Sequence, residues 1–364
     1  MTVEKLLEAL STVQEPDLGK DLVTLDMVKD LLIEENKVSF TVTLTTPACP
    51  LKDRIKNDCI RAIHSVNPKA IIQVNFTSTI NTNRKDMAMV LPEVKNIIAV
   101  VSGKGGVGKS TVASNFALSL AADGAKVGLM DADIYGPSLP IMFGVRGERP
   151  MMKNVNGKGM ILPLKKYGIS LMSIGLLIDE KNAVVWRGPM VSSAVRQFVS
   201  EVFWDELDYL VIDMPPGTGD IHLTLMQAVP VTGAIVVSTP QDVALADAKK
   251  AIAMFAQAQL KTPIIGLVEN MSYFVTDESP EHKYYIFGKE GGKRLAEEYD
   301  IPFLGQIPLI QSIREGGDEG IPVMLGNHEA SRKAFSEFAG NAARSIAMIN
   351  ANISADRRAQ VVVG

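Results

Sequence analysis

Cysteine is scarce in this chain of 364 residues, which contains only Cys49 and Cys59. Two cysteines are too few for a disulfide framework, and their scarcity fits a reducing compartment. The N-terminal residues 1–4 also lack the basic segment and the long apolar segment of a secretory signal. The sequence therefore predicts a cytoplasmic protein.

Long apolar runs and an excess of basic residues are missing as well. No run of about 18 apolar residues occurs, so we expect no transmembrane helix. The net charge is −4, whereas general binding to nucleic acid needs a basic surface. We therefore expect neither a membrane nor a nucleic acid as a partner.

The composition is that of a folded protein, with 46% hydrophobic and 21% charged residues. These ordinary values exclude a fully disordered or collagen-like chain. The length favours two domains, or one large domain with a small one attached. We expect a small α/β domain, a polar linker, a larger domain and a flexible tail, at residues 1–80, 81–95, 96–350 and 351–364.

The first 80 residues show both helical and strand patterns. Leu6 and Leu10 recur at helical spacing, and residues 37–45 alternate between apolar and polar as a half-buried strand does. A loop at 46–50 follows, then a second helix with Ile55, Cys59 and Ile63 on its apolar face, and a strand at 70–77. The segment is predicted to be a small α/β unit.

The larger domain alternates short apolar runs with longer helical stretches. Runs of about this length, without polar alternation, indicate strands buried on both faces of a parallel sheet, with helices between them. The prediction is an α/β fold with a mostly parallel, doubly wound sheet. The apolar runs are residues 97–101, 127–130, 209–212, 234–237, 264–268 and 303–307.

The most specific motif is the segment 103–111, GKGGVGKST, between the first of these strands and a predicted helix. It matches the phosphate loop G-x-x-x-x-G-K-[ST], in which glycines let backbone N–H groups approach phosphate oxygens. Lys109 is expected to contact the β- and γ-phosphates of ATP, and Ser110 to ligate Mg²⁺. A glycine-rich turn with a chance Lys-Ser pair is the alternative. The candidate nucleotide-binding residues of the loop are Gly103, Lys104, Gly105, Gly106, Val107, Gly108, Lys109, Ser110 and Thr111.

Aspartates follow two of the predicted strands. Asp213 ends a run of four apolar residues, which is the pattern of a Walker B carboxylate that holds the Mg²⁺ shell. The segment 215–220, PPGTGD, then suits a loop that senses the γ-phosphate. Asp131 and Asp133 follow another strand, at the sheet edge where ligands bind in such folds, although both could simply cap a turn. His222, just after the loop, could face solvent.

The phosphate loop resembles the deviant form found in the dimeric ATPases that include MinD, ParA and nitrogenase iron protein. The resemblance implies a homodimer in which Lys104 reaches the partner's nucleotide, as an arginine finger worth roughly 10³ to 10⁵ in rate does. A solvated loop charge is the alternative for Lys104. The resemblance also implies that Asp131 lies near Mg²⁺ and the attacking water, that Asp133 acts in hydrolysis, and that Asn270 and Pro308 contact adenine.

Three segments of the sequence resemble one family in particular. The segments 131–138 (DADIYGPS), 187–190 (RGPM) and 213–220 (DMPPGTGD) resemble the Mrp/NBP35 family, also called ApbC, of iron–sulfur cluster carriers. TPACP at 46–50 resembles the MIP18-type domain that bacterial Mrp proteins often carry. The resemblance implies a slow ATPase that binds iron–sulfur clusters and delivers them to apoproteins. A MinD/ParA-like positioning ATPase, acting on a membrane or DNA, is the alternative.

The chain departs from this family at one place. The family usually carries Cys-x-x-Cys shortly after the segment 270–275, NMSYFV, and here Thr276 and Ser279 stand at the two cysteine positions. Hydroxyls are poor ligands for iron–sulfur clusters, which select thiolates. Cys49 is the leading alternative ligand, although it could also be a plain buried thiol. Cys59 lies in an apolar helical pattern and is expected to be a core residue.

Overall fold

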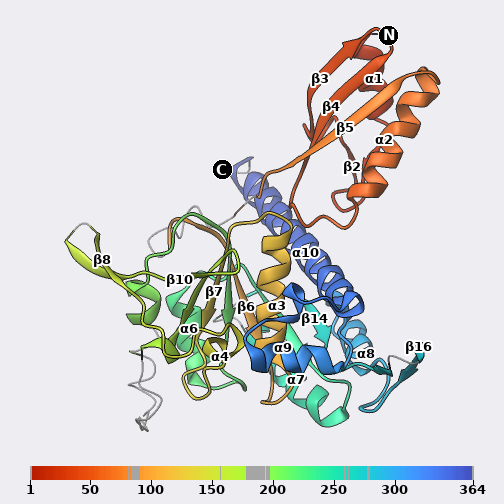
Figure 1. Ribbon diagram of the computed structural model, residues 1–364. Coiled ribbons are helices and arrows are strands. Elements are labelled where there is room, and N and C mark those ends of the chain that lie inside the picture. The colour runs from red at the N-terminus through yellow and green to blue at the C-terminus, as the bar shows by residue number, and fades with distance from the viewer. Residues whose placement is uncertain are drawn as a thin grey trace. The chain divides into compact units, whose positions relative to one another are not determined.

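The computed structural model describes residues 2–80, 82, 91–155, 157–177, 193, 197–257, 260, 262–276 and 279–362 (Figure 1). The chain separates into two compact units. One unit comprises residues 1–81 together with 346–364, and the other comprises residues 82–345. Each unit is described by itself below.

The N-terminal unit has the helices and the two main strands that the sequence predicts, and a further strand, β3, that the sequence analysis did not predict. β3 and β4 are antiparallel, and β4 and β5 are parallel. Val38, Phe40 and Val42 on β4 are fully buried, because every second side chain of this strand faces the helices. The elements are α1 (Val3–Leu10), β1 (Gln14–Glu15), β2 (Lys20–Asp21), β3 (Val28–Glu34), β4 (Lys37–Leu44), α2 (Lys52–Val66) and β5 (Ile71–Ser78).

The larger unit is built on an eight-stranded sheet with the order β10-β11-β7-β12-β6-β13-β14-β17. Only β10 is antiparallel to its neighbour. The predicted mostly parallel α/β sheet is confirmed, and all six apolar runs are strands in it. The strands are β6 (Val94–Val101), β7 (Val127–Asp131), β10 (Leu164–Lys166), β11 (Ile169–Ser173), β12 (Leu207–Asp213), β13 (Gly233–Ser238), β14 (Ile264–Glu269) and β17 (Phe303–Gln306).

The order of the strands places helices on both faces of this sheet. The chain moves one way along the sheet from β6 to β7, and the other way from β12 to β13, β14 and β17. Because such crossovers are right-handed, the helix of the first connection lies on the opposite face from those of the others. The helices are α3 (Lys109–Ala122) in the first connection, and α6 (Asp220–Ala228), α7 (Asp242–Ala256) and α8 (Gly291–Glu298) in the others.

Helix α3, which carries the end of the phosphate loop, is buried on nearly every side. It packs on the sheet and on α10, where the rings of Phe116 and Phe338 lie 5.3 Å apart. Its polar residues Ser114, Asn115 and Ser119 are buried as well as its apolar ones, so the helix needs such cover on both sides. The loop at its N-terminus is therefore held on a well-packed element.

The remaining elements are short helices, two hairpins and α10, whose residues from 346 onward belong to the other unit. α10 continues as a helix through residues 351–362, where the sequence analysis predicts a flexible tail. These elements are α4 (Leu139–Met142), β8 (Met152–Val155), β9 (Lys158–Ile161), η2 (Ile174–Leu176), β15 (Phe274–Thr276), β16 (Ser279–Tyr284), α9 (Gln311–Glu319), η3 (Val323–Leu325) and α10 (Glu329–Val362).

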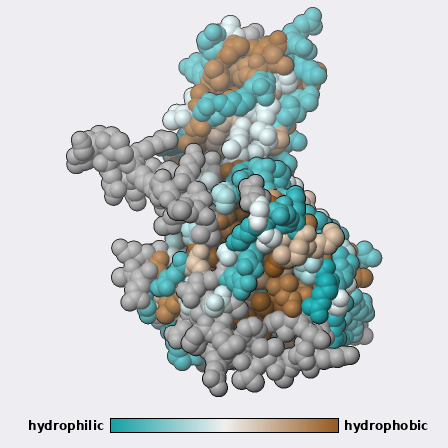
Figure 2. All heavy atoms as spheres, turned by 90° about the vertical axis from the view of Figure 1, so that its left-hand side faces the viewer, coloured by the Kyte–Doolittle hydropathy of each residue, from teal (hydrophilic) through white to brown (hydrophobic). Residues whose placement is uncertain are grey.

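The β8–β9 hairpin projects at the left of Figure 1 and bears exposed apolar side chains. Met151 and Met152 are 72% and 64% exposed. Figure 2 views this side, where hydrophobic residues, in brown, lie between hydrophilic residues, in teal. None of the helices within the described residues has the length and apolar character to cross a membrane.

Candidate nucleotide-binding site

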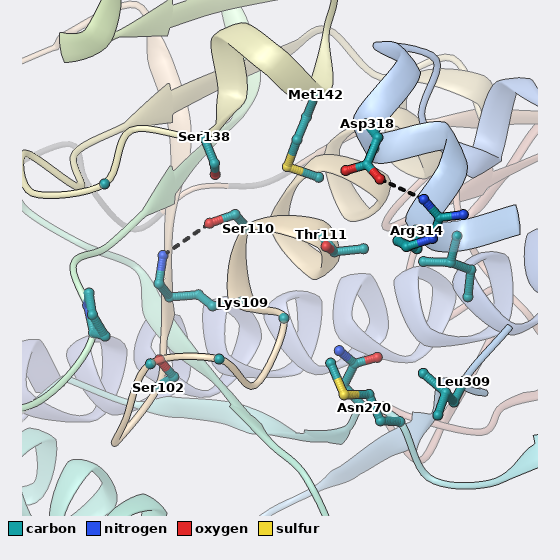
Figure 3. A pocket seen from close by; sticks show the side chains of 18 of the residues that line it. Ser102, Lys109, Ser110, Thr111, Ser138, Met142, Asn270, Leu309, Arg314 and Asp318 are labelled. Atoms are coloured by element: carbon teal, nitrogen blue, oxygen red, sulfur yellow. Dashed lines mark hydrogen bonds and ion pairs between the residues drawn. The ribbon is translucent and has the colours of Figure 1, made fainter. Parts of the chain in front are cut away.

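A cavity of about 550 Å³ lies at the carboxyl end of the parallel strands (Figure 3). Segments that follow β6, β7, β12, β14 and β17 meet around it, because the strands run in the same direction. Its size suits a small-molecule ligand. It is lined by Ser102, Lys104, Gly105, Gly106, Gly108, Lys109, Ser110, Thr111, Asp133, Gly136, Ser138, Ile141, Met142, Pro216, Asn270, Met271, Pro308, Leu309, Ile310, Ile313, Arg314, Gly317 and Asp318.

The phosphate loop joins β6 to α3 and forms one wall of this cavity. Gly108, the N-cap of α3, has a φ of 81°, and a Cβ there would lie 2.2 Å from Nδ2 of Asn270. A Cβ on Gly103 would lie 2.1 Å from the carbonyl oxygen of Asp247. Only glycine fits both conditions without moving the backbone. Gly103 and Gly108 are thus required by the local packing.

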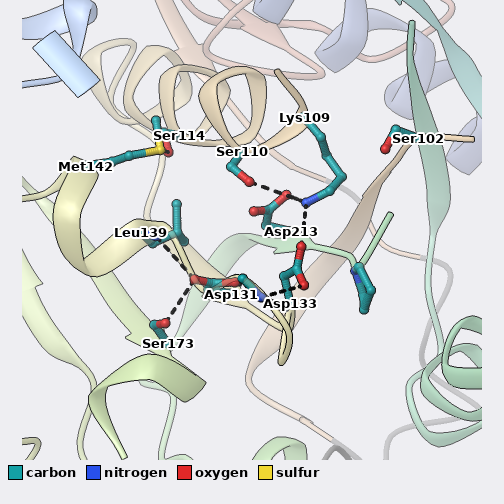
Figure 4. Close-up of polar contacts among 12 residues, drawn as sticks. Ser102, Lys109, Ser110, Ser114, Asp131, Asp133, Leu139, Met142, Ser173 and Asp213 are labelled. Atoms are coloured by element: carbon teal, nitrogen blue, oxygen red, sulfur yellow. Dashed lines mark hydrogen bonds and ion pairs between the residues drawn. The ribbon is translucent and has the colours of Figure 1, made fainter. Parts of the chain in front are cut away.

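The side chain of Lys109 is buried among acidic groups (Figure 4). Its Nζ lies 2.5 Å from Oδ1 of Asp213 and 3.9 Å from Oδ2 of Asp133, and it donates to the hydroxyl of Ser110 at 3.4 Å. Lys109 is 6% exposed and Asp213 is fully buried. An ammonium group held here would attract an anionic ligand as soon as a phosphate group entered.

The two carboxylate oxygens of Asp213 differ in their hydrogen bonding. Oδ1 accepts from Lys109, whereas Oδ2 is buried and has no hydrogen-bond partner among the described residues. Burial raises the pKa of Asp213 above its usual range, although the charge of Lys109 opposes this. A buried, unpartnered carboxylate oxygen is costly unless something binds it. Together with the hydroxyl of Ser110, it provides the oxygen ligands that Mg²⁺ prefers, so the residues fit this ion.

Asp131 holds the loop that follows β7 in place by accepting hydrogen bonds from its backbone. Its Oδ2 accepts from the hydroxyl of Ser173 at 2.9 Å and from the N–H of Leu139 at 3.2 Å, and its Oδ1 accepts from the N–H of Asp133 at 3.1 Å. Burial, and then the charge of Asp213, raise the pKa of Asp131 to about 7. Asp133 lines the cavity, and Asp131 does not. The two predicted catalytic aspartates therefore occupy different environments.

Asn270, which the sequence analysis expects to contact adenine, lines the cavity. Its Nδ2 donates to the carbonyl of Val107 at 2.8 Å, so the residue also holds the phosphate loop. Pro308, the other predicted base contact, also lines the cavity. The neighbouring Glu269 is fully buried and accepts from the N–H of Gly292 at 2.6 Å and from Nε2 of Gln306 at 3.0 Å. The segment after β14 is thus tied to α8 and β17.

The loop after β12 contacts the phosphate loop directly. The N–H of Gly217 donates to the carbonyl of Ser102 at 2.9 Å, and Pro216 lines the cavity. The expectation that His222 faces solvent is wrong. His222 is 1% exposed, its Nε2 lies 2.9 Å from the carbonyl oxygen of Pro215, and burial lowers its pKa. A neutral imidazole donating to Pro215 explains why this polar residue is inside.

The sequence analysis did not predict one wall of the cavity. Helix α9 contributes Ile313, Arg314, Gly317 and Asp318, and α4 contributes Met142. Arg314 forms ion pairs with Asp318 at 2.8 Å and with Glu315 at 3.0 Å. Two adjacent glycines within a helical pattern, at 316–317, were the available sequence signal for a close approach by another group.

The two cysteines lie in the N-terminal unit. Cys59 is fully buried in α2, as predicted, and burial, with a smaller effect of Asp58, raises its pKa to about 12. Cys49 is partly exposed, and its carbonyl accepts from the N–H of Lys52 at the start of α2. Within the described residues, no three His, Cys, Asp or Glu side chains form a group that could hold a metal ion.

The positions that lack the family's cysteine pair lie on a hairpin of the larger unit. Thr276 ends β15 and Ser279 begins β16, and the two residues are cross-strand partners. His282, on the same hairpin, is exposed. The hairpin brings the two hydroxyl-bearing positions together without supplying a thiolate.

The strand, glycine-rich loop and helix, with a lysine and a carboxylate at the sheet edge, define a P-loop NTPase fold. Residues 93–343 match the family described as NUBPL iron-transfer P-loop NTPase, and residues 4–76 match the family described as iron-sulfur cluster assembly protein. The first match covers more than half of the chain, which therefore belongs to the NUBPL iron-transfer P-loop NTPase family.

Relatives and solved structures agree with this assignment. The chain is 45% identical to the iron-sulfur cluster carrier protein of Synechocystis sp., covering 96% of this chain and 99% of the relative. It is 44% identical to the protein of the same name from Escherichia coli, covering 88% and 86%. A nucleotide-binding protein from Archaeoglobus fulgidus, solved with ADP, is 38% identical with a TM-score of 0.56, covering 66% of this chain and 92% of that one.

The substitution Lys109→Ala should abolish the binding of Mg-ATP, because the ammonium group that meets the phosphates is lost. Asp213→Asn should keep weak ATP binding and lose its dependence on Mg²⁺. Titration calorimetry with and without Mg²⁺ measures both effects. Undiminished Mg-ATP affinity in Lys109→Ala would refute this site.

The control concerns folding, because Lys109→Ala leaves Asp213 buried and unpaired. Such a change typically costs about 3–5 kcal/mol of stability. The double variant Lys109→Ala/Asp213→Asn removes both charges and should recover much of this loss in urea unfolding, while ATP binding stays absent. Recovered ATP binding in the double variant would show that the single variant failed only because it unfolded.

Iodoacetamide at about pH 8 should alkylate Cys49 and leave Cys59 intact, because the thiolate is the nucleophile and Cys59 is buried and protonated. Peptide mapping by mass spectrometry distinguishes the two sites. Both should react after unfolding in guanidinium, which serves as the control. Equal alkylation rates in the folded protein would contradict the burial of Cys59.

Proposed function

We propose that this protein binds Mg-ATP in the described cavity, hydrolyses it slowly, and carries iron–sulfur clusters to apoprotein acceptors. The observation that carries the nucleotide part is the buried contact of Lys109 with Asp213 beside the phosphate loop. The carrier part is supported by the relatives, which are named iron-sulfur cluster carrier protein at 45% and 44% identity over most of their length.

The nucleotide site divides its work among a few residues. The phosphates accept from the backbone N–H groups of the phosphate loop and from Lys109, which then exchanges part of its contact with Asp213 for them. Ser110 and Asp213 would hold Mg²⁺, which neutralises charge on the phosphates when bound. Asn270 and Pro308 contact adenine at the other end of the cavity. Asp133, which lines the cavity, is better placed than Asp131 to meet the attacking water.

Lys104 is proposed to act in a homodimer. It lines the cavity, and its side chain forms no ion pair within the part of the chain that the structure describes. An ammonium group without a partner of its own is available to the γ-phosphate of a nucleotide in a second copy. Hydrolysis would then require two copies, and the nucleotide would act as a conformational switch more than as a phosphate donor.

The cluster is the cargo, and thiolates limit how it can be held. A standard [4Fe–4S] cluster takes four thiolates, whereas a symmetric dimer holds four cysteines in total, two of them the buried Cys59. The partly exposed Cys49 is therefore the proposed protein ligand, with an added small thiol or an acceptor completing the set. Incomplete ligation leaves iron open to exchange, which suits a protein that gives its cargo away.

The comparisons favour this function over the positioning ATPase. The cell-division ATPase MinD of Pyrococcus furiosus is 25% identical with a TM-score of 0.50, covering 68% of this chain and 97% of that one. The cluster-carrier relatives are far closer in sequence and also cover the N-terminal unit. We propose that the protein acts in the cytoplasm, without a membrane or a nucleic acid as partner.

The cross-subunit role of Lys104 is tested by mixing two inactive variants. Lys104→Ala should lose hydrolysis and keep most of its ATP affinity, and Lys109→Ala should lose both. Heterodimers of the two contain one composite site with both lysines, so mixing should restore part of the phosphate release. If subunit exchange is demonstrated and hydrolysis stays absent, Lys104 does not act in trans.

The carrier function is tested by anaerobic reconstitution with iron and sulfide, followed by transfer to an apo-acceptor. The unmutated protein should load a labile cluster, Cys49→Ser should lose most of it, and Cys59→Ser should load normally once its folding is verified. Iron counts per dimer, the absorbance spectrum and acceptor activity are the readouts. Equal loading and transfer by Cys49→Ser would remove Cys49 from the proposal, and no loading by any form would remove the carrier function.

A further inference from the structure

Tyr167 occupies a backbone position that its side-chain type disfavours. With Gly168 it forms the two-residue turn between β10 and β11, and the φ angles of the two residues are 50° and 81°. Turns with positive φ at both positions usually take asparagine, aspartate or glycine first. A bulky residue in this left-handed region costs backbone energy, so its side chain is the place to look for a compensating role.

The side chain of Tyr167 contacts the ends of two short helices. Its hydroxyl donates to the carbonyl of Gly320 at 3.0 Å, and Gly320 is the C-cap of α9. Its ring lies 6.1 Å from the ring of Phe143, which is the C-cap of α4. Carbonyls at the C-terminus of a helix have no partner within the helix, so the hydroxyl of Tyr167 supplies a donor to this end of α9.

The same two helices form one wall of the nucleotide cavity. Figure 3 shows Met142 of α4 and Asp318 of α9 on the same side of the cavity. The helices are in contact, and their C-terminal ends approach so closely that a Cβ on Gly320 would lie 2.6 Å from Cα of Gly144. Tyr167 does not line the cavity and therefore contacts this wall from outside. The wall residues are Ile141, Met142, Ile313, Arg314, Gly317 and Asp318.

Helix α9 has little burial to hold it in place. None of its residues is buried. The ion pair of Arg314 with Asp318, at 2.8 Å, lies within the helix and does not fasten it to another element. After the helix, the N–H of Met324 donates to Oδ1 of Asn115 on α3 at 3.1 Å. A helix with few buried contacts depends on such single hydrogen bonds, so the bond from Tyr167 should contribute visibly to the position of α9.

We propose that Tyr167 is a positioning residue for the nucleotide, which acts by holding α9 against α4 and so sets the shape of the cavity wall. The inference rests on the proposed function, because it assumes that a nucleotide occupies this cavity. Without the hydroxyl, α9 is free to move away from α4, and part of the binding free energy must restore its place. ATP and ADP should be affected equally, because Lys109 and Ser110, which meet the phosphates, lie on another element.

The test compares Tyr167→Phe with the matched control Tyr299→Phe. Both tyrosines are 37% exposed, and each ring lies under a lysine, Lys166 at 5.0 Å and Lys249 at 5.9 Å. The hydroxyl of Tyr299, however, forms no hydrogen bond with any residue that the structure describes. Calorimetry with Mg²⁺ measures the affinities for ADP and for a non-hydrolysable ATP analogue, and steady-state kinetics gives kcat and KM for ATP. Hydrogen exchange follows the amides of residues 311–325, and urea unfolding verifies the fold.

Tyr167→Phe should bind both nucleotides about two- to ten-fold more weakly, the range expected for one lost hydrogen bond. KM for ATP should rise by a similar factor while kcat stays within about two-fold. The amides of α9 should exchange faster without nucleotide and regain protection with saturating ADP, and Tyr299→Phe should match the unmutated protein throughout.

The opposite results separate a positioning role from a purely structural one. If Tyr167→Phe is less stable in urea but binds both nucleotides normally, or if it loses affinity for only one of them, the role of Tyr167 is overturned and the proposed function stands. Failure of the unmutated protein to bind either nucleotide would overturn the proposed function and this inference with it.

Discussion

The structure of the larger unit depends on the buried ion pair between Lys109 and Asp213, because the two charges must be compensated inside the protein. Two opposite charges removed from water are costly unless their geometry is good and their remaining polar atoms are satisfied. Here the ammonium and one carboxylate oxygen meet at 2.5 Å, and the second oxygen is left over. The two charges compensate each other, but one carboxylate oxygen of Asp213 has no hydrogen-bond partner among the described residues. The site is therefore stable enough to fold and still incomplete without a ligand.

The surrounding structure divides the acidic groups into two kinds. Both oxygens of Asp131 accept hydrogen bonds, from Ser173, Leu139 and Asp133, and its raised pKa reflects burial beside another carboxylate. Asp213 keeps an open oxygen. Similar residues at the ends of neighbouring strands thus differ in what they can do, because one is used to hold the backbone and the other keeps an oxygen without a hydrogen-bond partner among the described residues. The distance of Asp131 and Asp213 from the phosphate loop along the sequence does not show which of these two roles each residue has.

The sequence predicted those parts of the fold that depend on local patterns. Strands buried on both faces appear as apolar runs, so β6 and β14 were found, and the glycines and Lys109 of the phosphate loop form a fixed motif. β11 was missed because Ser170 and Ser173 interrupt its apolar pattern, although both are buried. The hydroxyl of Ser173 faces a carboxylate 42 residues away in sequence, and no local rule reveals that pairing. His222 was misjudged for the same reason, since the default for a polar residue is solvent and its partner is a backbone carbonyl.

The wall formed by α9 differs in its attachment from the wall formed by α3. Almost all of α3 is buried, whereas α9 has no buried residue. One side of the cavity is thus part of the core, and the other is held by few contacts and can open locally at little cost. A nucleotide that touches both walls must use some of its binding free energy to order α9. Its measured affinity would then report the stability of that helix as well as the quality of the contacts, and mutations in α9 far from the nucleotide could change it without altering the site.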